Sequence, residues 1–177
     1  AIIDYREVAP LAATEDMYEL DADGNVVDNA NSRGYRAVAV PGQVAGLFLA
    51  LEKYGTIDLA KALEKPIEYA EKGFEVSEGL SGIIADNFDK INAFPASAAL
   101  YLKDGLPLEA GEILVNTDLA NTLRLIAEEG PDVIYNGPIG EAIAADMKAN
   151  GGLITMEDFV AYKPAIREPV VGKYRDY

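Results

Sequence analysis

The longest segment without a charged residue runs from Ala37 to Leu51, and its second half has helical spacing. Pro41 and Gly42 end an extended run, and the apolar residues that follow recur at positions i, i+3, i+4 and i+7: Val44, Leu47, Phe48 and Leu51. This spacing predicts a helix, and Gly55 is a typical stop. Because no charge appears before Glu52, the pattern predicts that the helix is buried on nearly all sides and forms the centre of the fold.

Two extended segments lie near the ends of the chain. Residues Ile2 to Val8 alternate in polarity, which predicts a strand that ends before Pro10. The alternation places Asp4 and Arg6 on one face of that strand, which we expect to lie in the interior. The segment from Glu168 to Tyr177 is also expected to be extended.

Most of the remaining chain reads as helices with recognisable starts and stops. We expect N-terminal caps at Asp58, Ser77 and Thr117, a new helix at Pro66, and a capping box formed by Thr155 with Asp158. The expected helices cover these segments: 58–64, 66–73, one continuous helix from 77 to about 91, a short helix from 95, 117–130, 138–150 and a last one that ends before 164. The residues around 106–115 are expected to be irregular, with at most a strand of two or three residues. The sequence thus predicts one mostly helical unit with short strands at its two ends.

Charge excludes several kinds of partner. The 177 residues contain 30 Asp and Glu against 15 Lys and Arg, which gives a formal net charge of −15. This charge repels phosphate backbones and anionic lipid surfaces, so we expect no nucleic-acid partner and no membrane partner. No apolar run approaches the length of a membrane span, and the start at Ala1 suggests a piece of a longer protein.

The chain contains no cysteine and no histidine. Thiol nucleophiles, thiolate metal sites and every catalytic pair that needs an imidazole are therefore excluded. The glycines of Gly137 to Gly140 lack the spacing of a dinucleotide site, and the turn at Asp21 to Asn25 lacks the spacing of a calcium loop. We expect no catalytic residue, no cofactor and no metal within these residues.

Arg6 is the one candidate for a binding role. An arginine on an interior strand needs a carboxylate partner, and Asp4 is its neighbour on the same face. From the residues alone, an Arg6–Asp4 ion pair is the favoured interpretation. The alternative is that the planar guanidinium binds a substrate carboxylate through two hydrogen bonds.

Four segments resemble one family. They are IDYREVAPLAATEDMY, AVPGQVAGLFLALEKYGT, GPDVIYNGPIGEAIAADMKANGGLITMEDFVAYKP and the closing GKYRDY. In this order and spacing they are similar to the large subunit of the γ-glutamyltranspeptidases, a superfamily that also includes capsule poly-γ-glutamate processing relatives and cephalosporin acylases. The resemblance extends over nearly the whole chain.

The resemblance implies a mostly α fragment with short terminal β-strands, part of an α+β N-terminal-nucleophile hydrolase with an αββα sandwich. In that family one precursor cuts itself into large and small subunits, and the threonine freed by the cut attacks the γ-glutamyl amide. That threonine belongs to the small subunit, so residues 1–177 are expected to be an inactive large-subunit segment. The family's arginine in the RE-A-P motif, Arg6 here, holds the α-carboxylate of the γ-glutamyl group.

The same resemblance implies the partners and the compartment. The partners are a γ-glutamyl small molecule and the protein's own catalytic small subunit, and family members are mostly periplasmic or secreted. A segment without its partner strands is also expected to self-associate. The rival hypothesis is a scaffold or interaction module of the same fold, in which Arg6 forms an ordinary ion pair. A threonine-led small subunit encoded after Tyr177 would distinguish the two.

Overall fold

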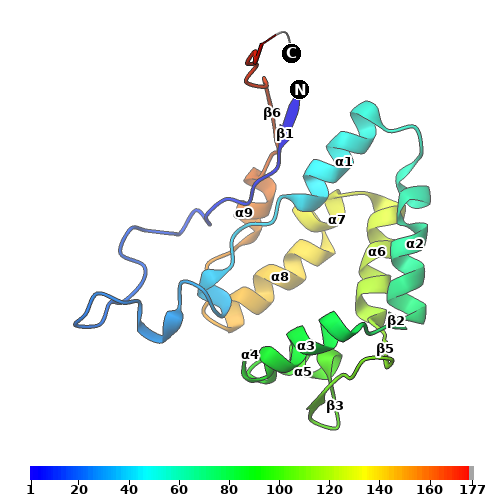
Figure 1. Ribbon diagram of the computed structural model, residues 1–177. Helices are drawn as coiled ribbons and strands as arrows, with labels where there is room; N and C mark the ends of the chain where they lie inside the picture. The colour runs from blue at the N-terminus through cyan, green and yellow to red at the C-terminus, as the bar shows by residue number, and fades with distance from the viewer. Residues whose placement is uncertain (176–177) are drawn as a thin grey trace. The chain divides into compact units, whose positions relative to one another are not determined.

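A computed structural model describes residues 1–175, and this part of the chain divides into two compact units (Figure 1). The first unit combines residues 1–59 with the segment from 129 onward, and the second contains residues 60–128. The division falls within helices at both boundaries, so no linker separates the two units in the sequence.

The first unit is helical and has one two-stranded sheet. Its elements are β1 (Ile2–Asp4), the 3₁₀ turns η1 (Val27–Asn29) and η2 (Tyr35–Ala37), α1 (Gln43–Tyr54), α7 (Asp132–Tyr135), α8 (Pro138–Ala149), α9 (Met156–Ala161) and β6 (Ala165–Arg167). The strands β1 and β6 pair antiparallel, with Ile2 opposite Arg167 and Asp4 opposite Ala165. A short strand near each end is confirmed, but the second strand covers Ala165–Arg167 and not the predicted segment from Glu168 to Tyr177. Residues 168–175 form no strand, and the last two residues of that predicted segment lie outside the described part of the chain. However, β1 is shorter than predicted, since Val8 forms only an isolated bridge with Val40.

The second unit contains two long helices, three short helices and two small two-stranded sheets among the described residues. Its elements are α2 (Leu59–Lys72), β2 (Phe74–Glu75), α3 (Glu78–Asp86), α4 (Phe88–Asn92), α5 (Pro95–Tyr101), β3 (Leu102–Lys103), β4 (Leu106–Pro107), β5 (Ile113–Leu114) and α6 (Thr117–Glu129). Strand β2 pairs antiparallel with β5, and β3 pairs antiparallel with β4. The two-residue strands β4 and β5 agree with the predicted irregular region. Its buried core includes Val76, Ile84, Leu108 and Leu114.

Several helix boundaries differ from the prediction. Pro66 lies inside α2 and does not begin a new helix. The helix continues past it although proline has no N–H to donate, so one helical hydrogen bond is missing there. The predicted helix from 77 to 91 is broken at Asn87, whose side-chain amide donates to the carbonyl oxygen of Ile83 at 2.9 Å. Ser77 does cap α3, and its hydroxyl accepts the Leu80 N–H. The cap of α6 is Asn116 rather than Thr117, because the Leu119 N–H donates to Asn116 Oδ1 at 2.9 Å.

The core of the first unit lies around α7 and α9, not around α1. Most of the buried apolar side chains lie on these two short helices or next to them, with one more on α8 and one before α1: Val133, Ile134, Tyr135, Ile154, Phe159 and Tyr162, then Met147 and Val40. Within α1 only Gly46 is buried, and Leu47 is 52% exposed. The prediction that α1 is buried on nearly all sides is therefore wrong. An apolar helix can be buried by other parts of a protein, but its composition does not show that residues 1–177 contain those parts.

Within the described residues, no helix is long and apolar enough to cross a membrane.

Candidate functional site

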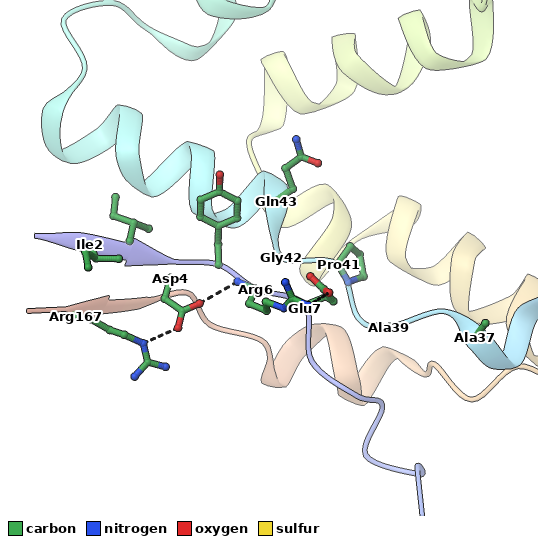
Figure 2. Close-up of a pocket in the computed structure, with 12 residues that line it drawn as sticks. Ile2, Asp4, Arg6, Glu7, Ala37, Ala39, Pro41, Gly42, Gln43 and Arg167 are labelled. Atoms are coloured by element: carbon green, nitrogen blue, oxygen red, sulfur yellow. Dashed lines mark hydrogen bonds and ion pairs between the residues drawn. The ribbon is translucent and has the colours of Figure 1, made fainter. Parts of the chain in front are cut away.

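An open pocket of about 890 Å³ lies beside the β1–β6 sheet of the first unit (Figure 2). Its walls come from residues 2–7, from the connection between η2 and α1, and from the end of β6. Four charged side chains line it: Asp4, Arg6, Glu7 and Arg167. The pocket therefore unites residues from the two ends of the described chain.

Two glycines let the walls of the pocket approach each other. A Cβ atom at Gly46 would lie 2.1 Å from Cγ of Tyr5, and a Cβ atom at Gly42 would lie 2.3 Å from the carbonyl oxygen of Tyr5. Neither position accepts a side chain without movement of Tyr5, the residue that follows β1. Gly42, just before α1, and Gly46, in its first turn, thus allow Tyr5 to pack directly against the start of this helix.

Arg6 lies at this pocket with its side chain 82% exposed, so the expectation of an interior position is wrong. Its guanidinium pairs with Glu7, with 3.3 Å between Arg6 Nη2 and Glu7 Oε1. The expected Arg6–Asp4 ion pair is also not formed. Instead, Asp4 Oδ1 accepts the backbone N–H of Arg6 at 3.2 Å, and Asp4 Oδ2 accepts Nε–H of Arg167 at 2.5 Å.

The Arg167 hydrogen bond lowers the pKa of Asp4, and the backbone N–H of Arg6 lowers it further. A lowered pKa means that the carboxylate stays ionised below the usual titration range of aspartate. The Asp4–Arg167 pair therefore persists at neutral pH and is lost only as the pH falls through that lowered pKa.

The arrangement suits the binding of a small carboxylate. Exposed ion pairs such as Arg6–Glu7 contribute only about 0–1 kcal/mol, so a ligand can displace Glu7 at little cost. A carboxylate that meets the guanidinium face to face gains two charge-assisted hydrogen bonds. Among the described residues, no group of His, Cys, Asp and Glu side chains could hold a metal ion.

The second unit has a separate pocket of about 370 Å³, and its chemistry is different. Side chains of α2, α3, α5 and α6 line it, and none of the lining residues is charged. Such a pocket offers no charged side chain for recognition of an ionised substrate. The pocket beside β1 is therefore the candidate functional site.

Sequence reasoning identified Arg6 and missed Arg167 as a member of the same pocket. The pairing of Asp4 with Arg167 spans 163 positions, and neither residue carries a local signal for it. Tyr162, whose hydroxyl donates to the carbonyl oxygen of Arg6 at 3.0 Å, was missed for the same reason. The antiparallel pairing of β1 with β6 brings Asp4 and Arg167 together, and Tyr162 reaches Arg6 from the end of α9.

The structure thus defines a mostly helical segment whose terminal strands pair beside a pocket lined by two carboxylates and two guanidiniums, and comparison with known proteins identifies the family. The family model described as Gamma-glutamyltranspeptidase matches residues 1–177, so this chain belongs to the γ-glutamyltranspeptidase family. A glutathione hydrolase proenzyme of Escherichia coli K12 is 43% identical over 176 residues, which are 99% of this chain. The Acylase ACY 1 proenzyme of Pseudomonas sp. SE83 is also 43% identical, over 181 residues and 99% of this chain.

The fold agrees with the family. The crystal structure of Helicobacter pylori γ-glutamyltranspeptidase superimposes with a TM-score of 0.93 at 40% identity, and the match covers 99% of this chain and 50% of that one. The present chain spans 30% of the E. coli proenzyme and 32% of the Pseudomonas acylase proenzyme. It thus corresponds to less than a third of these curated relatives.

Proposed function

We propose that residues 1–177 are a segment of the large subunit of an enzyme that transfers or hydrolyses γ-glutamyl groups, with glutathione and related γ-glutamyl amides as substrates. In this proposal a threonine of the small subunit, outside this chain, forms the acyl-enzyme. Arg6 contributes substrate binding by holding the α-carboxylate of the γ-glutamyl donor. The parent protein is an N-terminal-nucleophile hydrolase with an αββα sandwich, and it acts in the periplasm or outside the cell.

The observation that carries this proposal is the position of Arg6. Its guanidinium lies at an open pocket and has only a weak, exposed contact with Glu7. A guanidinium offers a planar fork that matches a carboxylate, and the donor of a γ-glutamyl transfer carries a carboxylate beside its α-amine. The relatives named as glutathione hydrolase proenzymes support the assignment of substrate and the division into two subunits.

A second candidate is an acylase that acts on cephalosporin side chains. The support for it is that an Acylase ACY 1 proenzyme is as similar to this chain as the E. coli glutathione hydrolase proenzyme is. The crystal structure of a cephalosporin acylase from Bacillus halodurans also matches 98% of this chain, with a TM-score of 0.84 at 26% identity. The two candidates differ in the donor, because a γ-glutamyl group has an α-carboxylate and an α-amine whereas a plain glutaryl group has no α-amine. A glutaryl amide and a γ-glutamyl amide, offered to the same full-length enzyme, distinguish them.

The test replaces Arg6 in the full-length precursor by lysine and by alanine. Donor recognition is measured as kcat/KM for a γ-glutamyl anilide and for the matching 4-aminobutanoyl anilide, which lacks only the α-carboxylate. We expect Arg6→Ala to lower kcat/KM for the γ-glutamyl donor by at least about tenfold, because one charge-assisted contact is worth about 1.5–3 kcal/mol. Arg6→Lys should restore little, since an ammonium lacks the planar fork.

The matched control is Arg33→Ala, which removes an exposed arginine of the same unit that does not line the pocket. Subunit formation on a gel confirms that each precursor still processes itself. If the Arg6 variants keep the parental preference for the γ-glutamyl donor, the carboxylate site lies elsewhere and Arg6 has only a structural role.

A further inference from the structure

Arg6 has an exposed side chain on a backbone that is held in place from both sides. It follows the three-residue strand β1 and lies outside regular secondary structure, so the sheet does not fix its peptide groups. Two side chains do so instead. Asp4 Oδ1 accepts the N–H of Arg6 at 3.2 Å, and the hydroxyl of Tyr162 donates to the carbonyl oxygen of Arg6 at 3.0 Å.

Tyr162 is a rigid anchor. Its side chain is buried, and its ring stacks on Tyr135 with 5.7 Å between the ring centroids and 19° between the planes. The hydroxyl of Tyr135 in turn donates to the carbonyl oxygen of Pro41 at 2.9 Å and accepts the N–H of Ala45 at 3.3 Å. The stacked pair therefore links the start of α1 to the Arg6 peptide.

The hydroxyl of Tyr162 also has little room to move. A Cβ atom at Gly42 would lie 1.8 Å from this hydroxyl oxygen, so the absence of a side chain at position 42 creates the space that the hydroxyl occupies. Burial raises the pKa of Tyr162, which keeps the hydroxyl protonated and able to donate at neutral pH.

Asp4 is the less rigid of the two anchors, and Arg167 on β6 fixes it. The Arg167 Nε–H donates to Asp4 Oδ2 at 2.5 Å, which leaves Oδ1 directed to the Arg6 N–H (Figure 2). This pair is too exposed to contribute much stability, with side-chain exposures of 31% for Asp4 and 63% for Arg167. Its structural effect is to orient the carboxylate.

We propose that Tyr162, Asp4 and Arg167 are positioning residues that set the affinity of Arg6 for the donor carboxylate. The proposal rests on the proposed role of Arg6 in donor binding. It adds that residues far along the chain, Tyr162 and Arg167, help to position Arg6. Tyr162 binds the Arg6 carbonyl and does not line the pocket, whereas Arg167 binds Asp4 and lines the pocket beside Arg6. A bidentate contact depends on the angle and position of the guanidinium, so a shift of its backbone weakens binding without removing the charge.

The experiment uses the full-length precursor with Tyr162→Phe, Arg167→Gln and the control Tyr54→Phe, which removes the hydroxyl of a tyrosine that is 63% exposed and does not line the pocket. Steady-state kinetics are measured with the γ-glutamyl anilide and the 4-aminobutanoyl anilide. We expect Tyr162→Phe to raise KM for the γ-glutamyl donor by about threefold to tenfold, the factor that corresponds to one hydrogen bond. The kcat should change less than twofold, and the constants for the 4-aminobutanoyl donor should not change.

A second comparison separates a positioning role from a general structural one. Tyr162→Phe and Arg167→Gln are each combined with Arg6→Ala, and both double variants should show no further loss of donor preference, because there is no guanidinium left to position. Arg167→Gln changes an exposed side chain and keeps the test valid if Tyr162→Phe fails to process itself.

The outcomes separate the two proposals. If Arg6→Ala abolishes the preference between donors while Tyr162→Phe and Arg167→Gln keep the parental KM, the positioning proposal is wrong and the role of Arg6 stands. The same conclusion follows if both substitutions weaken the two donors equally. If Arg6→Ala itself keeps the preference, the proposed function of Arg6 fails first.

Discussion

The buried carboxylate of Asp158 joins the start of α9 to a distant loop. Its Oδ2 accepts the N–H of Thr155 at 2.7 Å and the hydroxyl of Thr155 at 2.9 Å, while its Oδ1 accepts the N–H of Leu11 at 2.6 Å. The side chain of Asp158 is 3% exposed, so water cannot replace these acceptors. One residue thus caps a helix and fastens the segment that follows Pro10.

We expect Asp158→Asn to destabilise the chain by about 1–3 kcal/mol. Asparagine has one carbonyl oxygen, so either the Leu11 N–H or the Thr155 N–H would face an amide NH₂ group and lose its acceptor. Urea unfolding measures the loss, and Glu157→Gln serves as the matched control because Glu157 is an exposed neighbour in the same turn. Equal midpoints for the two variants would show that the buried hydrogen bonds contribute nothing.

The sequence predicts the contact of Asp158 with Thr155 and not its contact with Leu11. The capping box of Thr155 and Asp158 is a four-residue pattern, and the structure confirms it. The contact with Leu11 spans 147 positions, and no pattern of residue types indicates which backbone N–H will be orphaned near a capping aspartate. The same limit applies to Arg167, which reaches Asp4 only through strand pairing.

At the scale of elements, the helix that is most buried is not the one with the longest apolar stretch. Phe159 is fully buried on the six-residue helix α9, and its ring makes an edge contact with Tyr135 at 6.4 Å between centroids. Leu47 on the twelve-residue helix α1 is more than half exposed. The sequence pattern ranked these two helices in the opposite order.

We therefore expect Phe159→Ala to destabilise the chain by about 3–5 kcal/mol, because it empties a closed site in the core. Leu47→Ala should cost less than about 1 kcal/mol in the same 177-residue chain, since half of its side chain is already in water. Denaturant unfolding followed by circular dichroism compares the two variants. A larger loss for Leu47→Ala would restore α1 as the centre of the fold.

Errors in the helix boundaries have a common physical origin. Helix α3 ends at the cap residue Asn87, whose side-chain amide shares the carbonyl oxygen of Ile83 with its own backbone N–H, yet the apolar stripe on both sides of it is continuous. Pro66 is tolerated in α2 because the rest of the helix supplies enough hydrogen bonds and apolar contacts to outweigh one missing donor. Periodicity reports which face is apolar, and it is insensitive to a single competing hydrogen bond.

At the scale of the whole molecule, the chain has more apolar surface than its own two cores can cover. Large apolar side chains remain more than half exposed in both units, among them Leu47, Tyr54, Ile57, Tyr69, Ile83 and Leu106. The sequence could not reveal this, since an apolar residue has the same letter whether its partner lies within these 177 residues or outside them. The chain spans less than a third of its curated relatives, so we attribute the surface to contacts with the rest of the parent protein.

The exposed apolar surface favours self-association, whereas the net charge of −15 makes copies of the chain repel each other. The salt concentration determines which effect is larger. Repulsion between acidic copies is long-ranged at low ionic strength, where the Debye length is about 30 Å at 0.01 M, and short-ranged at about 3 Å in 1 M salt. Burial of apolar surface involves no charge, so ionic screening does not weaken it. We expect the purified chain to be mainly monomeric in 0.01 M sodium chloride at neutral pH and to self-associate reversibly as the salt rises toward 0.5 M.

Sedimentation equilibrium at several protein concentrations measures the effect as an increase of the average mass with salt. Returning the sample to low salt is the control, because aggregation of unfolded chain would not reverse. If the mass stays that of a monomer at every salt and protein concentration, the exposed apolar side chains do not form a cohesive surface. If association instead weakens as salt is added, ion pairs between copies hold the assembly, and the apolar surface is not its cause.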